Sequence, residues 1–418
     1  MKKIVIEGGK CLRGRVKISG SKNAALPILI ATLLTEGECT IENVPVLEDV
    51  RTILSLLSYL RKDNEFKNNR VVLAPSKNLN SEAPYELVKL MRASVLVSGP
   101  LLARLGQARV SLPGGCAIGA RPINLHLEAF RKMGASVHLE QGYLNMKCQR
   151  LRGARIYLDF PSVGATENIM MAATLARGIT CIENAACEPE VVDLAHFLER
   201  MGARISGAGT KEVVIRGVSG LRGARNYSII PDRIEAGSYI LAGIITGGRV
   251  LLEGARTDHL ESLIDKLCSI GAVIEENEKG VEVRRKGRLS ACDIETMPYP
   301  GFPTDLQAPW TALMSTVKGS SLITENIFEN RFLHIGELQR MGANIQIKGK
   351  SLMVQGVKRL TGAPVMATDL RGGIAMILAG LVAHGKTEIQ RIYHLKRGYE
   401  RLIWKLGGLG ARIKETKK

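Results

Sequence analysis

Hydrophobic and polar positions repeat along this chain with a period of about 70 residues. Five amphipathic helical patterns end in a Gly-Ala step that precedes a short apolar strand pattern, and glycine is the usual residue just beyond a helix. The glycines of these steps stand 68, 69, 71 and 68 residues apart, at Gly134, Gly202, Gly271, Gly342 and Gly410. A degenerate copy falls near Leu60-Arg61-Lys62, where the Gly-Ala step is missing. We therefore predict six repeats that together fill the chain.

A second set of elements keeps the same period. Each repeat begins with a long apolar helical pattern that ends in glycine, and a β-type run follows it. The helical patterns cover residues 23–37, 92–106, 166–178, 235–247, 305–319 and 369–385. The β-type runs cover residues 39–42, 109–112, 180–183, 249–252, 321–323 and 387–389. Each repeat is thus predicted to read helix, strand, helix, strand and hairpin strand, which is an α/β fold.

The last repeat differs from the others because no hairpin strand follows Ile413. We expect residues 1–19 to close this repeat. Repeats one to three then form one domain, residues 20–230, and the other three form a second domain, residues 1–19 plus 231–418. A continuous solenoid is the alternative, but it needs no such return of the N-terminus.

The cysteines and the apolar stretches argue against a metal site, secretion and membrane insertion. The eight cysteines include no Cys-x-x-Cys pair, and with seven scattered histidines they give no zinc spacing, so we expect no metal and no cofactor. Reduced thiols fit a cytoplasmic protein. The N-terminus turns polar too early for a signal peptide, and no uncharged apolar stretch reaches the roughly 18 residues that a spanning helix needs. We expect no membrane insertion, and the pattern does not specify an oligomeric state.

The net charge of +18 favours polyanionic or phosphorylated partners. Nucleic acid is the first class to consider, but the chain has no basic tail and only 4% aromatic residues to stack on bases. We therefore expect most of the excess Lys and Arg to cover the surface, and no nucleic acid as a partner.

The starts of the long helical patterns carry the first candidate chemistry. Lys22, Arg92, Arg233 and Arg371 stand close to helix N-termini, where a cation is unfavourable unless an anion sits there as well. Several such ends directed at one cleft between the domains would bind phosphate and carboxylate groups. Asp305 and Asp369 stand at equivalent starts and are either N-caps or bases that take a proton from a substrate hydroxyl. Spacing alone favours caps.

The segment from Leu112 to Pro122 places one thiol, Cys116, among small residues, with Arg121 five positions on. Glycine frees the backbone, so one interpretation is a mobile loop with an exposed thiol that the nearby guanidinium activates. The other is a glycine-rich turn around a buried, unreactive cysteine. The segment by itself supports both.

Several longer stretches resemble one known family. They are Ser21 to Pro27, Gly114 to Pro122, Pro161 to Asn168, Pro231 to Glu235, Phe302 to Gln307, Phe328 to Phe332 and Arg397 to Glu400. Together they resemble the UDP-N-acetylglucosamine 1-carboxyvinyltransferases, which are enolpyruvyl transferases. The resemblance implies two inside-out α/β barrel domains, each of three βαβαββ repeats, with the active site in the cleft between them.

The resemblance also implies an activity, which is transfer of the enolpyruvyl group of phosphoenolpyruvate to the 3′-hydroxyl of UDP-N-acetylglucosamine with release of phosphate. This reaction begins peptidoglycan synthesis and passes through addition and then elimination. By the same resemblance Cys116 is the proton donor and Asp305 the base for the hydroxyl, with Lys22 and Arg397 also catalytic.

The implied binding residues fall into three groups. The cations around phosphoenolpyruvate are Lys22, Arg92, Arg121 and Arg397. The residues that hold the sugar nucleotide are Asn23, Arg121, Pro122, Ile123, Asn124, Leu125, Ser162, Val163, Asp305 and Ile327. Arg331, Asp369 and Arg371 fall in the matching cleft segments.

Some positions depart from the family pattern. Asn124 and Lys396 stand where the family commonly has Asp, and Gly372-Gly373 replaces the usual Ala-Ser or Ala-Gly. Three alternatives remain open: the related shikimate-phosphate enolpyruvyl transferase, a basic repeat protein that binds nucleic acid, and a second copy of the enzyme that has lost activity. Substrate exchange in a phosphate-release assay separates the first, and salt-sensitive retention on nucleic acid without turnover would support the second.

Overall fold

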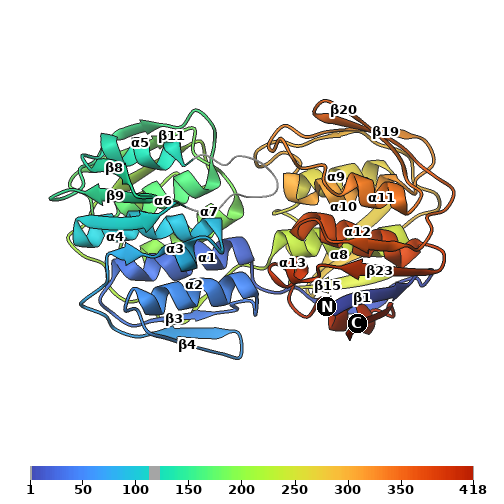
Figure 1. Ribbon diagram of the computed structural model, residues 1–418, viewed down its shortest axis with the longest axis horizontal. Coiled ribbons are helices and arrows are strands. Elements are labelled where there is room, and N and C mark those ends of the chain that lie inside the picture. The colour runs from blue at the N-terminus through green and yellow to red at the C-terminus, as the bar shows by residue number, and fades with distance from the viewer. Residues whose placement is uncertain (1, 113–122, 418) are drawn as a thin grey trace. The chain divides into compact units, whose positions relative to one another are not determined.

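The computed structural model describes residues 2–112 and 123–417, which form two compact units (Figure 1). Unit 1 contains residues 2–19 and 231–417, and unit 2 contains residues 20–112 and 123–230. Both units have the same architecture, so each is described by itself.

Unit 2 contains three four-stranded sheets with the orders β14-β3-β5-β4, β6-β7-β9-β8 and β10-β11-β13-β12. The strands are β3 (Cys39–Glu42), β4 (Asn64–Lys67), β5 (Arg70–Leu73), β6 (Glu82–Ala83), β7 (Gln107–Ser111), β8 (Ser136–Glu140), β9 (Tyr143–Lys147), β10 (Arg155–Tyr157), β11 (Ile179–Glu183), β12 (Arg204–Ser206), β13 (Glu212–Arg216) and β14 (Tyr227–Ser228). The helices are α1 (Lys22–Ala31), η1 (Thr32–Leu34), α2 (Glu48–Tyr59), α3 (Tyr85–Val88), η2 (Arg92–Val97), α4 (Ser98–Leu105), α5 (Asn124–Lys132), α6 (Val163–Ala173) and α7 (Pro189–Arg200).

Unit 1 contains the sheets β16-β17-β15-β2, β18-β19-β21-β20 and β22-β23-β1-β24. Its strands are β1 (Lys2–Glu7), β2 (Arg13–Lys17), β15 (Arg249–Glu253), β16 (Ala272–Asn277), β17 (Gly280–Arg285), β18 (Ile294–Glu295), β19 (Ser320–Thr324), β20 (Asn344–Lys348), β21 (Ser351–Gln355), β22 (Pro364–Met366), β23 (Lys386–Gln390) and β24 (Arg412–Lys417). Its helices are α8 (Arg233–Thr246), α9 (Glu261–Ser269), η3 (Thr304–Leu306), α10 (Gln307–Met314), α11 (Ile335–Arg340), α12 (Leu370–Val382), α13 (Tyr393–Lys396) and α14 (Leu402–Gly408).

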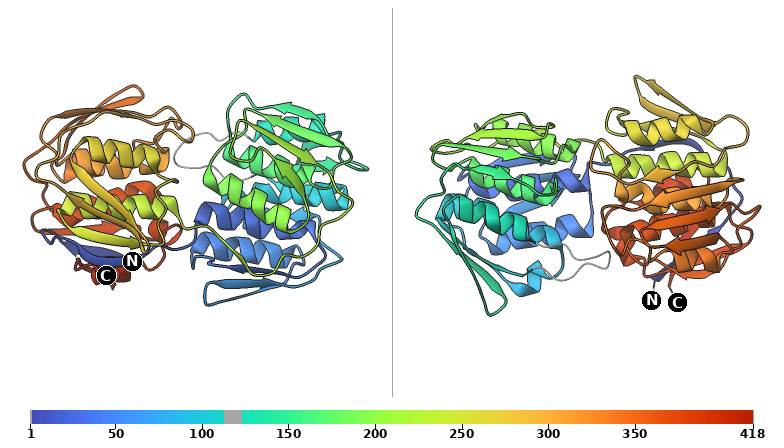
Figure 2. Two further views of the ribbon diagram at one scale, coloured as in Figure 1. Left: turned by 180° about the vertical axis from the view of Figure 1, so that it is seen from behind. Right: turned by 90° about the horizontal axis from the view of Figure 1, so that it is seen from above.

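Helices form the core of each unit, and sheets lie around them, as the views in Figure 2 show. In unit 1, α8, α10 and α12 pack on one another, and nearly every residue of each is buried. A helix that is apolar all round is one that is buried all round. In unit 2, α4 packs on α6 in the same way. The predicted fold of two inside-out α/β barrels, each of three βαβαββ repeats, is confirmed.

Every sheet has one parallel pair and two antiparallel pairs of strands. Three strands, β1, β2 and β14, pair with strands that are distant in the sequence. β1 pairs with β23 and β24 and so closes the last repeat, as predicted for residues 1–19. The prediction is wrong for β2, because this strand pairs in parallel with β15 and opens the fourth repeat. In unit 2 the strand β14 returns to pair with β3 of the first repeat.

Two details of the predicted repeat need correction. A strand precedes the long helix in each repeat, and most of these strands span only two or three residues, too few to show a period-2 pattern. The patterns at 92–106 and 305–319 are not single α-helices, because each starts as a 3₁₀ turn, η2 or η3, before α4 or α10 begins.

The missing Gly-Ala step of the first repeat has a conformational cost. The glycines of the other five steps have φ between 89° and 107°, and Arg61, at the equivalent position, is also left-handed with φ 64°. This conformation costs a non-glycine residue about 1 kcal/mol. We expect Arg61→Gly to raise the free energy of unfolding by about 0.5–1 kcal/mol, measured by urea denaturation. The control is Arg51→Gly on the exposed face of α2, which should lower the free energy of unfolding by about 1 kcal/mol. If both variants change the free energy of unfolding in the same direction, this account is wrong.

A buried carboxylate holds β14 in place. The hydroxyl of Tyr227 lies 2.6 Å from Oδ1 of Asp193, and the backbone N–H of Ile230 donates to Oδ2 at 3.3 Å. Burial raises the pKa of Asp193 to about 6, although these hydrogen bonds work against the shift. The folded state therefore favours the protonated acid, and its stability falls as pH rises from about 4 to 6.

This shift predicts a pH-dependent difference between the wild type and Asp193→Asn, which does not titrate. The free energy of unfolding of the wild type, relative to the variant, should fall by about 3 kcal/mol between pH 4 and 7. Urea denaturation at several pH values measures the difference. Exposed Asp63→Asn is the matched control, and a pH-independent difference for Asp193→Asn would refute the prediction.

Candidate functional site

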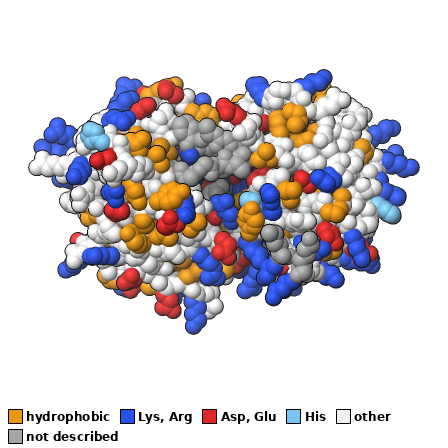
Figure 3. Space-filling view, viewed as in Figure 1, with side chains coloured by type: hydrophobic (Ala, Val, Ile, Leu, Met, Phe, Trp, Pro, Cys, Tyr) orange, Lys and Arg blue, Asp and Glu red, His pale blue; other side chains and the backbone are white. Residues whose placement is uncertain are grey.

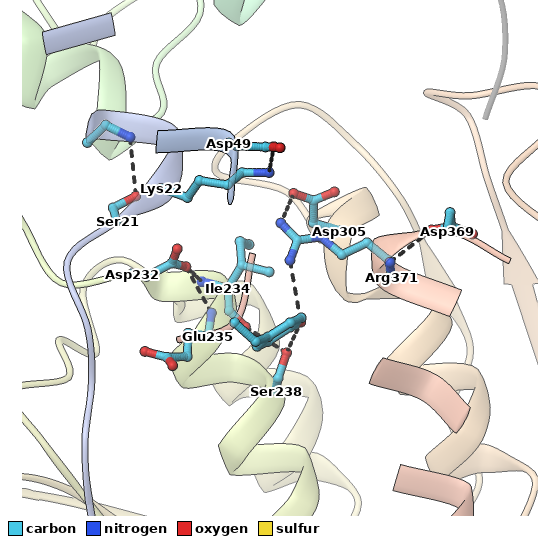
Figure 4. Close-up of polar contacts among 12 residues, drawn as sticks. Ser21, Lys22, Asp49, Asp232, Ile234, Glu235, Ser238, Asp305, Asp369 and Arg371 are labelled. Atoms are coloured by element: carbon cyan, nitrogen blue, oxygen red, sulfur yellow. Dashed lines mark hydrogen bonds and ion pairs between the residues drawn. The ribbon is translucent and has the colours of Figure 1, made fainter. Parts of the chain in front are cut away.

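Two buried arginines in unit 1 share the carboxylate of Asp305. Arg331 Nη2 donates to Oδ1 at 2.6 Å. Arg371 Nη2 donates to Oδ2 at 2.7 Å (Figure 4). Their side chains are only 3% and 8% exposed. Asp305 lies in η3, Arg331 before α11, and Arg371 in the first turn of α12, so three segments distant in sequence meet at one carboxylate.

The ion pairs of this cluster determine the charge states of its members. Burial opposes the charge on Asp305, but Arg371 and Arg331 outweigh it and hold the pKa of the carboxyl well below its usual range. Burial also opposes the charge on Arg371, yet Asp305 raises the pKa of that guanidinium. Asp305 is not the only anion beside these cations, because Asp369 interacts electrostatically with Arg331, and Asp232 with Arg371. Nε of Arg331 is buried without a hydrogen-bond partner among the described residues, so the cluster retains an unused donor.

The structure shows which of the two aspartates caps a helix. Asp369 is the N-cap of α12, because its Oδ1 accepts from the backbone N–H groups of Arg371 at 2.8 Å and Gly372 at 3.1 Å. Asp305 caps no helix that the structure describes, since the caps before η3 and α10 are Pro303 and Leu306. The spacing interpretation as a cap is therefore correct for Asp369 and wrong for Asp305.

Gly372 gives the Asp369 cap its compact form. A Cβ at this position would lie 2.4 Å from Thr368 Oγ1 and 2.9 Å from Asp369 Oδ2. Thr368 Oγ1 in turn donates to Asp369 Oδ2 at 3.0 Å. Glycine here, a departure from the family pattern, lets the hydroxyl and the cap share this space.

Four residues that the sequence analysis did not select surround the cluster. Tyr399 places its hydroxyl 3.4 Å from Arg371 Nη1 and 2.8 Å from Ser238 Oγ. Burial lowers the pKa of His334 to about 4, Arg331 adds to this, and Asp369 opposes it. Burial likewise lowers the pKa of His394, with Arg397 adding to the shift and Asp369 opposing it. Arg397 directly follows α13, and both Arg397 and Asp369 therefore lie close enough to His394 to shift its pKa.

In unit 2, Lys22 is buried against a carboxylate that the sequence analysis did not predict. Lys22 Nζ lies 3.3 Å from Asp49 Oδ2, and their side chains are 13% and 6% exposed (Figure 4). Lys22 is the first residue of α1, whose cap Ser21 accepts from Ala24 N. The anion expected beside this cation thus includes a protein carboxylate from the first turn of α2.

Six of the residues predicted to hold the sugar nucleotide lie at helix starts in unit 2. Asn23 is the second residue of α1, while Ile123 to Leu125 begin α5 and Ser162 with Val163 begin α6. A hydrogen bond of 2.9 Å between Asn168 Nδ2 and His126 Nδ1 joins α6 to α5, so the last two starts lie close together. Ile327, in unit 1, is held through its backbone N–H by Glu325.

Other predicted positions have plain outcomes. Cys116, Arg121 and Pro122 lie outside the described residues. Arg92 begins η2 and adds to the burial that lowers the pKa of His126 to about 4. Lys396 is exposed and lies 3.4 Å from Glu415, which compensates its charge.

Much of the charge excess lies in two terminal segments of unit 1. Residues 1–19 and 386–418 contain 16 Lys and Arg against 4 Asp and Glu. They supply β1, β2, β23, β24, α13 and α14, and most of their cationic side chains are exposed (Figure 3). The expectation that surface residues carry most of the excess is confirmed.

Among residues 2–112 and 123–417, one group has the composition of a metal site: Cys181, Glu183 and Glu212 on sheet β10-β11-β13-β12. Glu183 already accepts a hydrogen bond from Arg155, and none of the three is a predicted site residue. No described helix has the length and hydrophobicity required to cross a membrane.

Comparisons with known proteins show the family to which the chain belongs. The model of the EPSP synthase family (3-phosphoshikimate 1-carboxyvinyltransferase) matches residues 6–406. The chain is 57% identical over 415 residues to UDP-N-acetylglucosamine 1-carboxyvinyltransferase of Nitratidesulfovibrio vulgaris, covering 99% of both chains. It is 56% identical over 418 residues to UDP-N-acetylglucosamine 1-carboxyvinyltransferase 2 of Carboxydothermus hydrogenoformans, covering 100% of both.

Solved structures support the fold. The enolpyruvyl transferase NikO of Streptomyces tendae matches with a TM-score of 0.89 at 24% identity, covering 100% of this chain and 99% of that one. EPSP synthase of Acinetobacter baumannii matches with a TM-score of 0.78 at 18% identity, covering 100% of both chains. With the relatives above, these matches show that the chain belongs to the EPSP synthase family of enolpyruvyl transferases and, within it, to the UDP-N-acetylglucosamine 1-carboxyvinyltransferases.

Proposed function

We propose that the protein transfers the enolpyruvyl group of phosphoenolpyruvate to the 3′-hydroxyl of UDP-N-acetylglucosamine and releases phosphate. Full-length relatives at 54–57% identity carry the name of this activity. The observation that carries the proposal is the Asp305 carboxylate between Arg331 and Arg371, because it combines a proton acceptor with an unused donor, Nε of Arg331. In a bacterial cell this reaction would commit the sugar nucleotide to peptidoglycan synthesis in the cytoplasm.

The proposed reaction has two stages. In the addition, the 3′-hydroxyl oxygen bonds to C2 of phosphoenolpyruvate, the hydroxyl proton passes to Asp305, and C3 gains a proton from Cys116. In the elimination, C3 returns a proton to the Cys116 thiolate and the bond from C2 to the phosphate oxygen breaks. Phosphate leaves with the proton that Asp305 held, so both residues regain their starting states. Lys22, Arg92, Arg121 and Arg397 would hold the phosphate and carboxylate groups as charge develops.

The low pKa of Asp305 adds a condition to this reaction. A carboxylate paired with two guanidiniums is a weak base, so it accepts a proton poorly while both pairs persist. Phosphoenolpyruvate is itself an anion and would compete for Arg331 and Arg371. We propose that its binding weakens the hold of these arginines on Asp305 and raises the pKa of the base when the hydroxyl is in place.

The remaining predicted residues would bind the sugar nucleotide. They are Asn23, Arg121, Pro122, Ile123, Asn124, Leu125, Ser162, Val163 and Ile327. The backbone N–H groups at the starts of α1, α5 and α6 favour negative charge there. Asp369 would act through the α12 start that carries Arg371 rather than as a base.

The deciding experiment is release of phosphate from phosphoenolpyruvate with UDP-N-acetylglucosamine as acceptor. We expect turnover with this acceptor and none with shikimate 3-phosphate. The opposite preference would support the shikimate-phosphate transferase, and no turnover with either acceptor would refute the proposal.

We also expect the reaction to need no metal ion, because cations of the chain bind the substrate charges. Activity after dialysis against a chelator, assayed in its presence, should stay within twofold of the untreated enzyme. A loss that added magnesium or zinc restores would contradict this expectation.

A further inference from the structure

Glu325 is a buried carboxylate whose oxygens are all occupied by neutral donors. It follows β19 directly and is 4% exposed. Oε1 accepts from Thr296 Oγ1 at 2.9 Å, from Ile327 N at 2.9 Å and from Phe328 N at 3.1 Å. Oε2 accepts from Thr304 Oγ1 at 2.8 Å. Burying a carboxylate costs free energy unless its oxygens are bonded in this way.

These donors come from three separate segments of unit 1. Thr296 follows β18, Thr304 begins η3, and Ile327 with Phe328 forms the turn after β19. Thr304 immediately precedes Asp305, and Ile327 is a predicted contact of the sugar nucleotide. One side chain therefore fixes the segment of the proposed base and the backbone at a proposed substrate contact.

We propose that Glu325 is a positioning residue that sets Asp305 and the Ile327 turn for the sugar nucleotide. This inference rests on the proposed function. Glu325 does not touch the reacting atoms; it acts through Thr304 on the direction of the Asp305 carboxylate, and through two backbone N–H groups on the turn. Small displacements of such groups are costly because catalysis depends on their geometry.

Two variants alter the bond between Glu325 and Thr304 and leave the two backbone bonds to the Ile327 turn in place. Thr304→Val removes the hydroxyl beside Asp305 at almost constant volume, and Thr304→Ser restores a hydroxyl. Glu325→Gln keeps one acceptor oxygen for Ile327 N and Phe328 N, but presents an NH₂ group toward Thr304. Thr324→Val is the matched control, because Thr324 ends β19 next to Glu325, but its hydroxyl lies 2.9 Å from Ser351 Oγ of β21 and does not bond Glu325.

The test measures kcat and both KM values by phosphate release, binding of UDP-N-acetylglucosamine by calorimetry, and Tm. We expect Thr304→Val and Glu325→Gln to lower kcat at least tenfold and to raise the KM for UDP-N-acetylglucosamine several-fold. The KM for phosphoenolpyruvate and the Tm should change little, and Thr304→Ser should regain most of the lost turnover. Thr324→Val should retain the wild-type kinetic constants.

Kinetic constants within twofold of the wild type in both Thr304→Val and Glu325→Gln would overturn the inference. A fall in Tm without a kinetic change would overturn it as well, since it would assign Glu325 to stability alone. If the wild type does not turn over, the proposed function fails. The positioning role is then judged by calorimetry, and equal affinities for UDP-N-acetylglucosamine in wild type and variants would overturn it.

Discussion

Replacing Asp305 is expected to lower kcat by about a thousandfold, the typical contribution of a general base. The carboxylate is the proposed acceptor of the hydroxyl proton, and it bonds both Arg331 and Arg371. Asp305→Asn keeps the shape of the side chain, but its amide oxygen can satisfy one guanidinium while its NH₂ group faces the other. Phosphate release under saturating substrates measures the loss.

Stability must be measured in parallel, because Asp305→Ala leaves two buried guanidiniums without their shared carboxylate. Breaking a buried ion pair from one side costs about 3 kcal/mol or more. Glu388→Ala is the matched control: Glu388 pairs with Lys3 at 2.6 Å on the exposed face of sheet β22-β23-β1-β24. It should change stability by less than about 1 kcal/mol and leave kcat unchanged. Near-normal kcat in folded Asp305→Asn would remove Asp305 from the mechanism.

The proposed exchange of arginine partners makes a separate prediction about protons. Without substrate the pKa of Asp305 is well below its usual range, so the carboxylate is ionised at pH 5. If phosphoenolpyruvate draws Arg331 and Arg371 away, the pKa rises and Asp305 binds part of a proton. Calorimetry in buffers of different ionisation enthalpy should therefore show more proton uptake at pH 5 for the wild type than for Asp305→Asn. Equal uptake would contradict the exchange.

Cys116→Ser is expected to lower kcat by about two orders of magnitude or more, the second large effect. A serine hydroxyl has a far higher pKa than a thiol and donates its proton poorly. The same phosphate-release assay measures the change. Cys11→Ser is the matched control, because Cys11 is exposed and belongs to no predicted site.

The same thiol should react with the epoxide phosphonate fosfomycin. In this reaction the sulfur bonds to an epoxide carbon, and the carbon–oxygen bond opens. With UDP-N-acetylglucosamine present, mass spectrometry should find the adduct on the peptide that contains Cys116 and not on those with exposed Cys11 or Cys268. Unmodified Cys116 after such treatment would argue strongly against its proposed role.

Local pattern was sufficient for most of the fold. The positions of the five Gly-Ala steps record a backbone requirement, since their glycines have the positive φ that ends a helix. The helices α8 and α12 are buried on all sides, and their almost uniformly apolar sequences predict this burial. Pairing between distant segments was harder to predict, and only β1 was placed correctly. The partners of β2 and β14 depend on hydrogen bonds to strands over 180 residues away, which no local pattern records.

Some features of the candidate site could likewise be predicted from the sequence, and others could not. The sequence by itself determined the repeat, the family resemblance and the charged residues at helix starts, because each depends on a short stretch of the chain. Only the tertiary structure decided what those charges face: Asp49 beside Lys22, two arginines on Asp305, and Glu325 beneath Thr304 and Ile327. It also showed that Asp369 is a cap and Asp305 is not. The physical reason is that pKa and hydrogen bonding depend on distance and burial, and packing brings together groups that are far apart in sequence.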